Sequence, residues 1–157
     1  MNKNIEDIKK NAKKHSEILA RLGKELFEIR FNYKVTGNTK TEYWQKRIDD
    51  FKKYHQKGTD YYTQVHLLMN IFNEKEAQLF LLNMSKMRQL GTRLMELLEK
   101  VKQNPSIMSP KDKQQSKWSK GLKEELIDCS NKNLEHEIHM NTVFRDFYEK
   151  HLKEHVG

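Results

Sequence analysis

The chain has 157 residues, of which 36% are hydrophobic and 33% are charged. This small apolar share excludes a globule with an interior several layers thick, but it suffices for long helices that each bury a narrow strip of side chains. Only two prolines and six glycines occur, so few positions would break a helix. The length indicates one domain, and these features together predict an all-α protein.

Thirty Lys and Arg residues outnumber 22 Asp and Glu residues, which gives a net charge of +8. This excess attracts polyanions but carries no information about the fold. The single cysteine, Cys129, cannot form an internal disulfide, and no apolar run reaches the roughly 18 residues that would span a bilayer. The N-terminal residues lack an apolar signal core, so we expect an intracellular protein, in the cytoplasm or the nucleus.

The first predicted helix covers residues 4–34. Apolar residues and one histidine recur there at alternating intervals of three and four, which places them on one strip of an α-helix. A turn at residues 35–38 should end this helix, with Gly37 in the left-handed conformation. The strip consists of Ile5, Ile8, Ala12, His15, Leu19, Leu22, Leu26, Ile29 and Tyr33.

The second predicted helix covers residues 39–72. Because the connection to it is short, the first two helices should lie antiparallel. If the turn is centred near Gly37, His15 lies opposite Gly58. The second strip consists of Trp44, Ile48, Phe51, His55, Gly58, Tyr62, Val65, Met69 and Phe72.

The strip changes phase after Phe72, where Asn73 and Glu76 have the spacing of a helix N-cap and its partner. One interpretation is a tight reversal into a third helix over residues 74–103. The other is a single kinked helix over residues 39–103, because neither Gly nor Pro occurs at the junction. The reversal is favoured, since a compact bundle hides the wide apolar face of the third helix. The third strip consists of Ala77, Phe80, Met84, Met87, Gly91, Leu94, Leu98 and Val101.

Further apolar residues flank the third strip, so this face is wider than one neighbouring helix covers. We therefore expect the third helix to contact at least two others, within the chain or in another subunit. Gly91 lies on the strip, where it allows a neighbouring backbone to approach closely. The predicted partner-binding residues are Leu81, Leu90, Met95 and Leu97.

Residues 104–116 form a polar connection that holds both prolines, and Ile107 and Met108 are its only apolar residues. A fourth helix is predicted over residues 116–155. Its middle, residues 130–139, is poorly patterned, so the helix is either interrupted or mostly exposed there. The fold class that follows is an antiparallel bundle of three to four long helices with coiled-coil-like heptad packing. The apolar residues of the fourth helix are Trp118, Leu122, Leu126, Cys129, Met140, Val143, Phe144, Phe147, Tyr148 and Leu152.

The seven histidines raise the question of a metal site. His151 and His155 have the four-residue spacing that places two imidazoles on one helix face, but the Glu-x-x-His motif of helical di-iron sites does not occur. His15 and His55 fall on the predicted strips, where a hydrogen-bonded core histidine is the usual explanation. We therefore expect no catalytic residue, no cofactor and no metal site.

Lysines at helical spacing form a band near the N-terminus. The predicted antiparallel register brings a second group of lysines to the same end of the hairpin. Together they would present a positive surface to a phosphate backbone. The predicted polyanion-binding residues are Lys9, Lys10, Lys13, Lys14, Lys52, Lys53 and Lys57.

The wide apolar face and the lack of a catalytic motif favour a non-enzymatic scaffold or adaptor subunit. Such a subunit would join a larger assembly, as a homo- or hetero-oligomer, through helix packing. An alternative is a helical bundle that binds nucleic acid by charge and without sequence preference. A third hypothesis is a helical-bundle metalloprotein.

Overall fold

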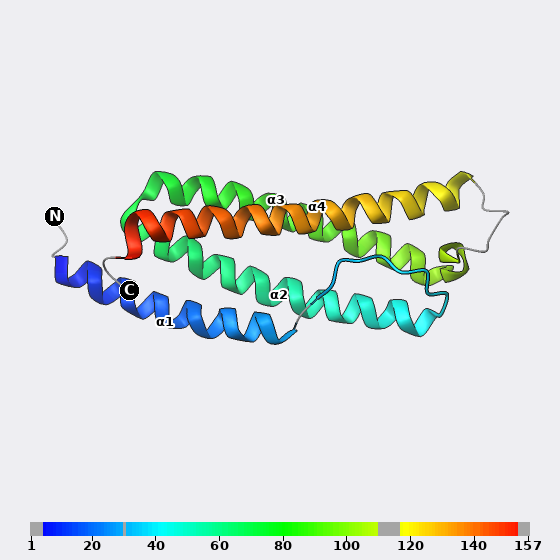
Figure 1. Ribbon diagram of the computed structural model, residues 1–157, viewed down its shortest axis with the longest axis horizontal. Helices are drawn as coiled ribbons and strands as arrows, with labels where there is room; N and C mark the ends of the chain where they lie inside the picture. Colours follow the sequence, from blue (N-terminus) through cyan, green and yellow to red (C-terminus); the bar gives the residue numbers. More distant parts are fainter. Residues whose placement is uncertain (1–4, 30, 110–116, 154–157) are drawn as a thin grey trace. The chain divides into compact units, whose positions relative to one another are not determined.

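The computed structural model describes residues 5–29, 31–109 and 117–153. It contains four long α-helices (Figure 1), namely α1 (Ile5–Ile29), α2 (Thr41–Phe72), α3 (Glu74–Gln103) and α4 (Lys117–Phe147). A short 3-10 helix, Pro105–Met108, follows α3, and a π-helical segment, Tyr148–Leu152, follows α4. The helices pack against one another and the described residues form no strand, which confirms the predicted all-α bundle.

The chain divides into two compact units. The first contains Met1–Arg30, Gln56–Lys86 and Ile138–Gly157, and the second contains Phe31–His55 and Met87–Glu137. Accordingly, α1 belongs to the first unit, while α2, α3 and α4 each contribute residues to both. Within the described ranges, no helix is both long enough and apolar enough to cross a membrane.

The first helix is shorter than predicted, because α1 ends at Ile29 and residues 31–40 are not helical. In this segment Phe31, Tyr33 and Val35 are half-buried in the second unit, whereas the residues between them are exposed. Alternate burial is a property of an extended chain, in which every second side chain points to the same side. The predicted helix over residues 4–34 is therefore wrong at its C-terminal end.

The longer connection also changes how α1 pairs with α2 in the first unit. His15 hydrogen-bonds to Gln64, six residues beyond Gly58, which is its predicted neighbour. Lys57 Nζ lies 2.7 Å from Glu25 Oε2, so the two helices do run antiparallel. The predicted register is nevertheless wrong, because ten non-helical residues replace the expected four-residue turn.

Asn73 alone separates α2 from α3. Its side chain caps α3, since Asn73 Oδ1 accepts a hydrogen bond of 3.0 Å from the backbone N–H of Glu76. The chain reverses at this residue, and α3 returns alongside α2 (Figure 1). In the first unit, for example, the ring centroids of Tyr62 and Phe80 are 6.1 Å apart. The two helices thus form a tight hairpin rather than a single kinked helix.

The fourth helix continues through the stretch in which the sequence pattern is weak. Its middle buries Cys129, Asn133 and His136, whose intervals of four and three residues continue the buried strip in polar form. The Asn133 amide donates hydrogen bonds to the backbone oxygens of Leu90, at 3.1 Å, and Cys129, at 2.9 Å. These bonds satisfy the buried Asn133 amide, which would lower the stability of the fold if it had no acceptor. Residues 130–139 were predicted either to interrupt the fourth helix or to be mostly exposed. The predicted interruption is wrong, because α4 is continuous through them.

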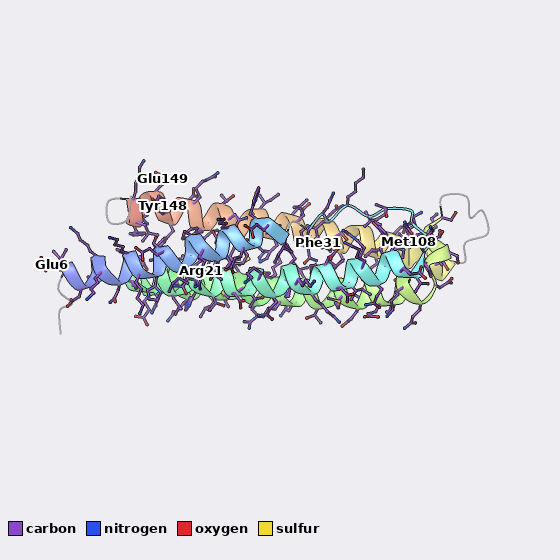
Figure 2. All side chains as sticks on the ribbon, turned by 90° about the horizontal axis from the view of Figure 1, so that it is seen from below. Glu6, Arg21, Phe31, Met108, Tyr148 and Glu149 are labelled. Carbon is purple, nitrogen blue, oxygen red and sulfur yellow. The ribbon has the colours of Figure 1, made fainter. Side chains whose placement is uncertain are left out.

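The second unit has a core of fully buried side chains. The predicted linker over residues 104–116 is helical near its start, where Ile107 and Met108 enter this core. Met108, labelled in Figure 2, is the last residue of the 3-10 helix that follows α3. Residues 110–116 lie outside the described part of the chain. The core consists of Trp44, Ile48, Phe51, Leu94, Leu97, Leu98, Val101, Ile107, Met108, Leu122, Leu126 and Cys129.

Gly91 of α3 lies against the His55 side chain, which supplies the three atoms nearest to a Cβ built there, whereas a neighbouring backbone was predicted. A Cβ atom on Gly91 would lie 2.3 Å from His55 Cε1, far inside van der Waals contact. The imidazole has little room to move, because its ring centroid lies 5.4 Å from that of Phe51. We expect Gly91→Ala to lower the free energy of unfolding by about 1–3 kcal/mol through overpacking, as measured by urea denaturation.

Gly121→Ala is the matched control for this substitution. Gly121 is exposed on α4, and a Cβ atom there would meet nothing within 4 Å. Since alanine favours a helix interior over glycine, this change should raise the free energy of unfolding by about 0.5–1 kcal/mol. If both variants are stabilised alike, the contact between Gly91 and His55 does not exist in solution.

Candidate functional site

The predicted partner-binding residues of α3 do not share one exposed face. Leu81 is 40% exposed, whereas Leu90 and Met95 are half-buried. Leu97 is fully buried and lies in the core of the second unit. Side chains of α2 and α4 share that core, so this flank of α3 meets its two neighbouring helices within the chain and Leu97 is not available to a partner.

Two leucines that the sequence analysis did not single out are more exposed than these. Leu79 is 57% exposed and Leu82 is 68% exposed. They are three residues apart, so their side chains project from the same side of α3. We call this pair the α3 leucine surface. The sequence did contain a signal for this surface, because the four residues from Leu79 to Leu82 are all apolar. They make one helical turn apolar on every side, and such a turn cannot be buried completely at the surface of a bundle.

A groove of about 240 Å³ adjoins the α3 leucine surface in the first unit, between α3 and the C-terminal part of α4. Leu79 lines it, and the buried Phe80 and Phe147 make its inner wall apolar. Charged side chains of both signs also line it. They are Glu76, Asp146 and Lys150.

The predicted polyanion-binding lysines do not form one surface in the way the sequence suggested. Lys57 forms an ion pair with Glu25, which lies three turns beyond Lys14 on α1. The hydrogen bond from Lys57 lowers the pKa of the Glu25 carboxyl. Lys57 therefore lies apart from the α1 lysines, because the register that joined them is wrong. The remaining predicted lysines are exposed, namely Lys9, Lys10, Lys13 and Lys14 of α1 and Lys52 and Lys53 of α2.

The described residues contain no group of three histidine, cysteine, aspartate or glutamate side chains that could hold a metal ion. His151 Nε2 lies 2.9 Å from Glu76 Oε2, and His155 lies outside the described residues. Burial lowers the pKa of the His55 imidazole and raises the pKa of the Cys129 thiol. Burial therefore favours the uncharged forms of both side chains.

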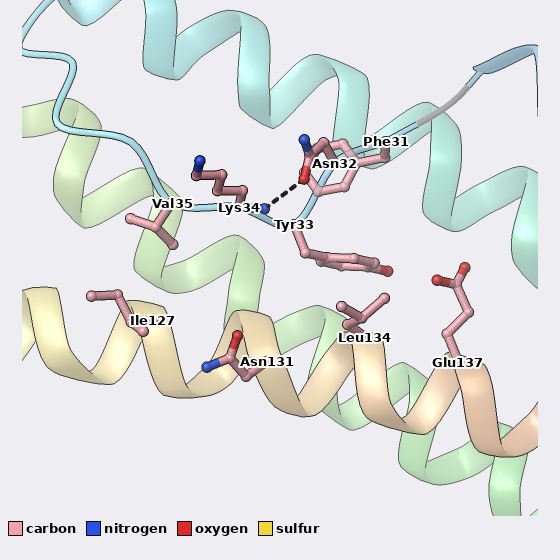
Figure 3. A pocket seen from close by; sticks show the side chains of 9 residues that line it. All are labelled: Phe31, Asn32, Tyr33, Lys34, Val35, Ile127, Asn131, Leu134 and Glu137. Atoms are coloured by element: carbon pink, nitrogen blue, oxygen red, sulfur yellow. Dashed lines mark hydrogen bonds between the residues drawn. The ribbon is translucent and has the colours of Figure 1, made fainter.

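A second cavity, of about 570 Å³, lies in the second unit between residues 31–35 and α4 (Figure 3). Tyr33 and Val35 point toward α4, whereas Lys34 points away from it. We call this cavity the aromatic hollow. The side chains from α4 recur every three or four residues and so line one side of that helix. They are Ile127, Asn131, Leu134 and Glu137.

Aromatic rings hold the extended segment in place beside the aromatic hollow. The ring centroids of Phe31 and Tyr33 lie 5.8 Å and 6.1 Å from that of Tyr54, which belongs to α2. The guanidinium carbon of Arg47 lies 4.3 Å from the Phe31 ring centroid, and its Nη2 donates a hydrogen bond to the backbone oxygen of Asn32. Side chains of α2 therefore anchor both the rings and the backbone of the segment.

Glu137 is the acidic side chain of the aromatic hollow. The Tyr54 hydroxyl donates a hydrogen bond to Glu137 Oε1. Burial raises the pKa of the Glu137 carboxyl, and this hydrogen bond offsets part of the rise. Burial, and then the nearby Glu137 carboxylate, raise the pKa of the Tyr33 phenol, whose hydroxyl is directed toward that carboxylate (Figure 3). Tyr33 is therefore neutral in the physiological pH range.

The aromatic hollow combines aromatic and aliphatic walls with one desolvated carboxyl, which suits it to binding. Its lining includes no nucleophile paired with a base. The sequence analysis assigned its residues no role, although apolar and polar residues alternate from Phe31 to Thr36, which is the signal of an extended segment. Comparisons with models of protein families, with curated proteins and with solved structures found no match.

Glu137→Gln tests the electrostatic environment of this carboxyl. Because burial raises the folded-state pKa above the ordinary value of 4.5, the contribution of Glu137 to stability is complete below that pH. It is lost as the pH rises through the folded-state pKa. Glutamine cannot ionise, but it keeps an oxygen for the Tyr54 hydrogen bond. We expect the free energy of unfolding of the variant, relative to wild type, to increase from about pH 4 to about pH 8 in urea denaturation.

Glu135→Gln is the control, because Glu135 is exposed on the same helix and its replacement removes the same formal charge. The free energy of unfolding relative to wild type should increase more with pH for Glu137→Gln than for this control. Equal pH profiles for the two variants would show that the Glu137 carboxyl is not desolvated.

Proposed function

We propose that this protein is a non-enzymatic helical subunit that binds a partner protein by helix packing, as a scaffold or adaptor within a larger assembly. The observation that carries the proposal is the exposure of Leu79 and Leu82 on one side of α3. Single exposed apolar side chains are ordinary, but neighbouring ones beside an apolar groove indicate an interaction surface. We further infer an intracellular location, cytoplasmic or nuclear, because the single cysteine is free and buried.

An amphipathic helix is the kind of partner that fits the α3 leucine surface. Apolar side chains recur on such a helix every three or four residues, which matches the spacing of Leu79 and Leu82. Burying each leucine would contribute about 1.5–3 kcal/mol. Glu76, Asp146 and Lys150 of the adjoining groove offer charges of both signs that can orient the partner. The proposal covers both a second copy of this chain and a different protein.

Replacing both leucines with glutamate should remove this binding. The double variant Leu79→Glu/Leu82→Glu places two charges where a partner would bury apolar surface, so we expect its affinity to fall at least about 100-fold. Light scattering after size-exclusion chromatography measures self-association. Affinity capture from the native source, followed by mass spectrometry, identifies a different partner.

The double variant Thr92→Glu/Gln103→Glu is the matched control. Both residues are exposed on α3, and neither lines the groove. A partner that is retained by wild type and by the control, but lost from the leucine variant, supports the proposal. The proposal fails if wild type is a monomer that retains no protein specifically, or if both variants lose the partner equally.

As an alternative function, we propose charge-driven binding of nucleic acid without sequence preference. The observation that favours it is the band of exposed lysines at helical spacing on α1, which is independent of the incorrect hairpin register. Cations in such a band neutralise backbone phosphates and release their counterions. The residues that would carry this binding are Lys9, Lys10, Lys13 and Lys14.

Reversing these four lysines to glutamate should abolish binding to duplex DNA at low salt. In wild type, the logarithm of the binding constant should fall with the logarithm of salt concentration by about 0.9 per phosphate contact. Fluorescence anisotropy with labelled DNA of two unrelated sequences measures both the slope and the lack of preference.

A second reversal variant separates the lysine band from net charge alone. It changes the same number of exposed lysines elsewhere, so the net charge of the two variants is equal. Binding that falls equally in both variants, or survives in the first, would contradict a role for the band. The control positions are Lys75, Lys86, Lys100 and Lys120.

A further inference from the structure

The aromatic hollow of the second unit has one charged group directed into it. Glu137 points from α4 toward the extended segment, whereas Lys34, the basic lining residue, points away from α4 (Figure 3). The other lining residues are aromatic, aliphatic or amide side chains. The charge that this lining directs into the aromatic hollow is therefore that of the Glu137 carboxyl, which is negative when ionised.

Within the described part of the chain, Glu137 has no cationic partner. The Tyr54 hydroxyl donates one hydrogen bond to Oε1, and no lysine, arginine or histidine adds to the shift of this carboxyl. Carboxylates removed from water are ordinarily paired with a cation, because an unpaired one is costly. A bound cation would offset that cost.

We propose that the aromatic hollow binds a small organic cation with an apolar body, and that the Glu137 carboxylate is its counter-ion. Its volume of about 570 Å³ falls within the range of about 300–1,000 Å³ that is usual for small-molecule sites. Val35, Ile127 and Leu134 provide apolar contacts for the body of the ligand. The Asn131 side-chain oxygen is a second acceptor for an ammonium group.

Aromatic rings beside the carboxyl strengthen the case for a cation. The face of an aromatic ring is negative, so it attracts an ammonium or guanidinium group. The extended segment already shows this preference, because Arg47 lies over the Phe31 ring at 4.3 Å. Tyr33 is the corresponding ring within the aromatic hollow, with its hydroxyl directed toward Glu137. An anionic ligand would meet repulsion from Glu137 there.

The site is independent of the proposed partner binding, since none of its residues belongs to the α3 leucine surface. The full-length protein can therefore be tested alone with defined probes. The cationic probe is 2-phenylethylammonium, and its neutral and anionic counterparts are 2-phenylethanol and 3-phenylpropionate. Ammonium chloride at the same ionic strength tests whether a cation that lacks an apolar body also binds. Methyl NMR signals of Ile127 and Leu134 report occupancy at the site itself.

The titrations are performed at about pH 8, because burial raises the pKa of the Glu137 carboxyl and a higher pH favours its ionised form. We expect 2-phenylethylammonium to shift both methyl signals with a Kd on the order of 1 mM, and 3-phenylpropionate and ammonium to shift neither. Glu137→Gln should weaken the cationic probe at least about 10-fold and change the neutral probe less than about twofold. Glu135→Gln, on the exposed face of α4, should bind as wild type does.

Leu134→Trp provides a second test that does not depend on the folding of Glu137→Gln. Leu134 is 41% exposed, so α4 can carry the larger side chain, which would fill the aromatic hollow. Binding of both the cationic and the neutral probe, followed by the Ile127 methyl signal that this variant retains, should then be lost. The proposal is overturned if 2-phenylethylammonium binds Glu137→Gln or Leu134→Trp as tightly as wild type, or if 3-phenylpropionate shifts the methyl signals more than the cation does.

Discussion

The structure of the second unit depends on the burial of Phe31 and Tyr33 between α2 and α4. In a helix these residues would point about 200° apart, so only one of them could face the unit. In an extended chain they point to the same side, and both rings reach Tyr54. The extended conformation therefore lets both half-buried rings pack against the core of the second unit, which a further turn of α1 would not allow.

A polar strip through α4 limits how this helix can pack. Asn133 and His136 occupy positions that carry apolar side chains in the rest of the helix. Because the Asn133 amide reaches the backbone oxygen of Leu90, a shift of α4 along α3 by one turn would leave a buried donor unsatisfied. The strip contributes less apolar burial than leucine would, but it specifies one alignment of the two helices. The exposed Leu134 shows that apolar residues of α4 are not all directed inward.

Heptad spacing predicted the helices well because it follows from the geometry of one helix alone. The hairpin at Asn73 was also accessible, since an N-cap has a local signature. Spacing does not tell which neighbour covers each flank of a strip, so the buried Leu97 was assigned to partner binding while the exposed Leu79 was not. The register of α1 failed for a different reason. It required residues 31–34 to continue the first helix and residues 35–38 to form the turn, and the alternating pattern from Phe31 to Thr36 was overlooked.

The same extended segment accounts for the aromatic hollow. Side chains on one side of an extended chain are about 6.8 Å apart, whereas successive turns of a helix are about 5.4 Å apart. Two such rows cannot stay in register, so Tyr33 and Val35 do not fill every space between the side chains of α4. Where the mismatch leaves room, Glu137 stands desolvated beside an aromatic ring without a lysine or arginine from the described residues. If position 137 only had to fill the core, an apolar residue would make the fold more stable. A desolvated carboxyl at this position is therefore an argument for a bound ligand.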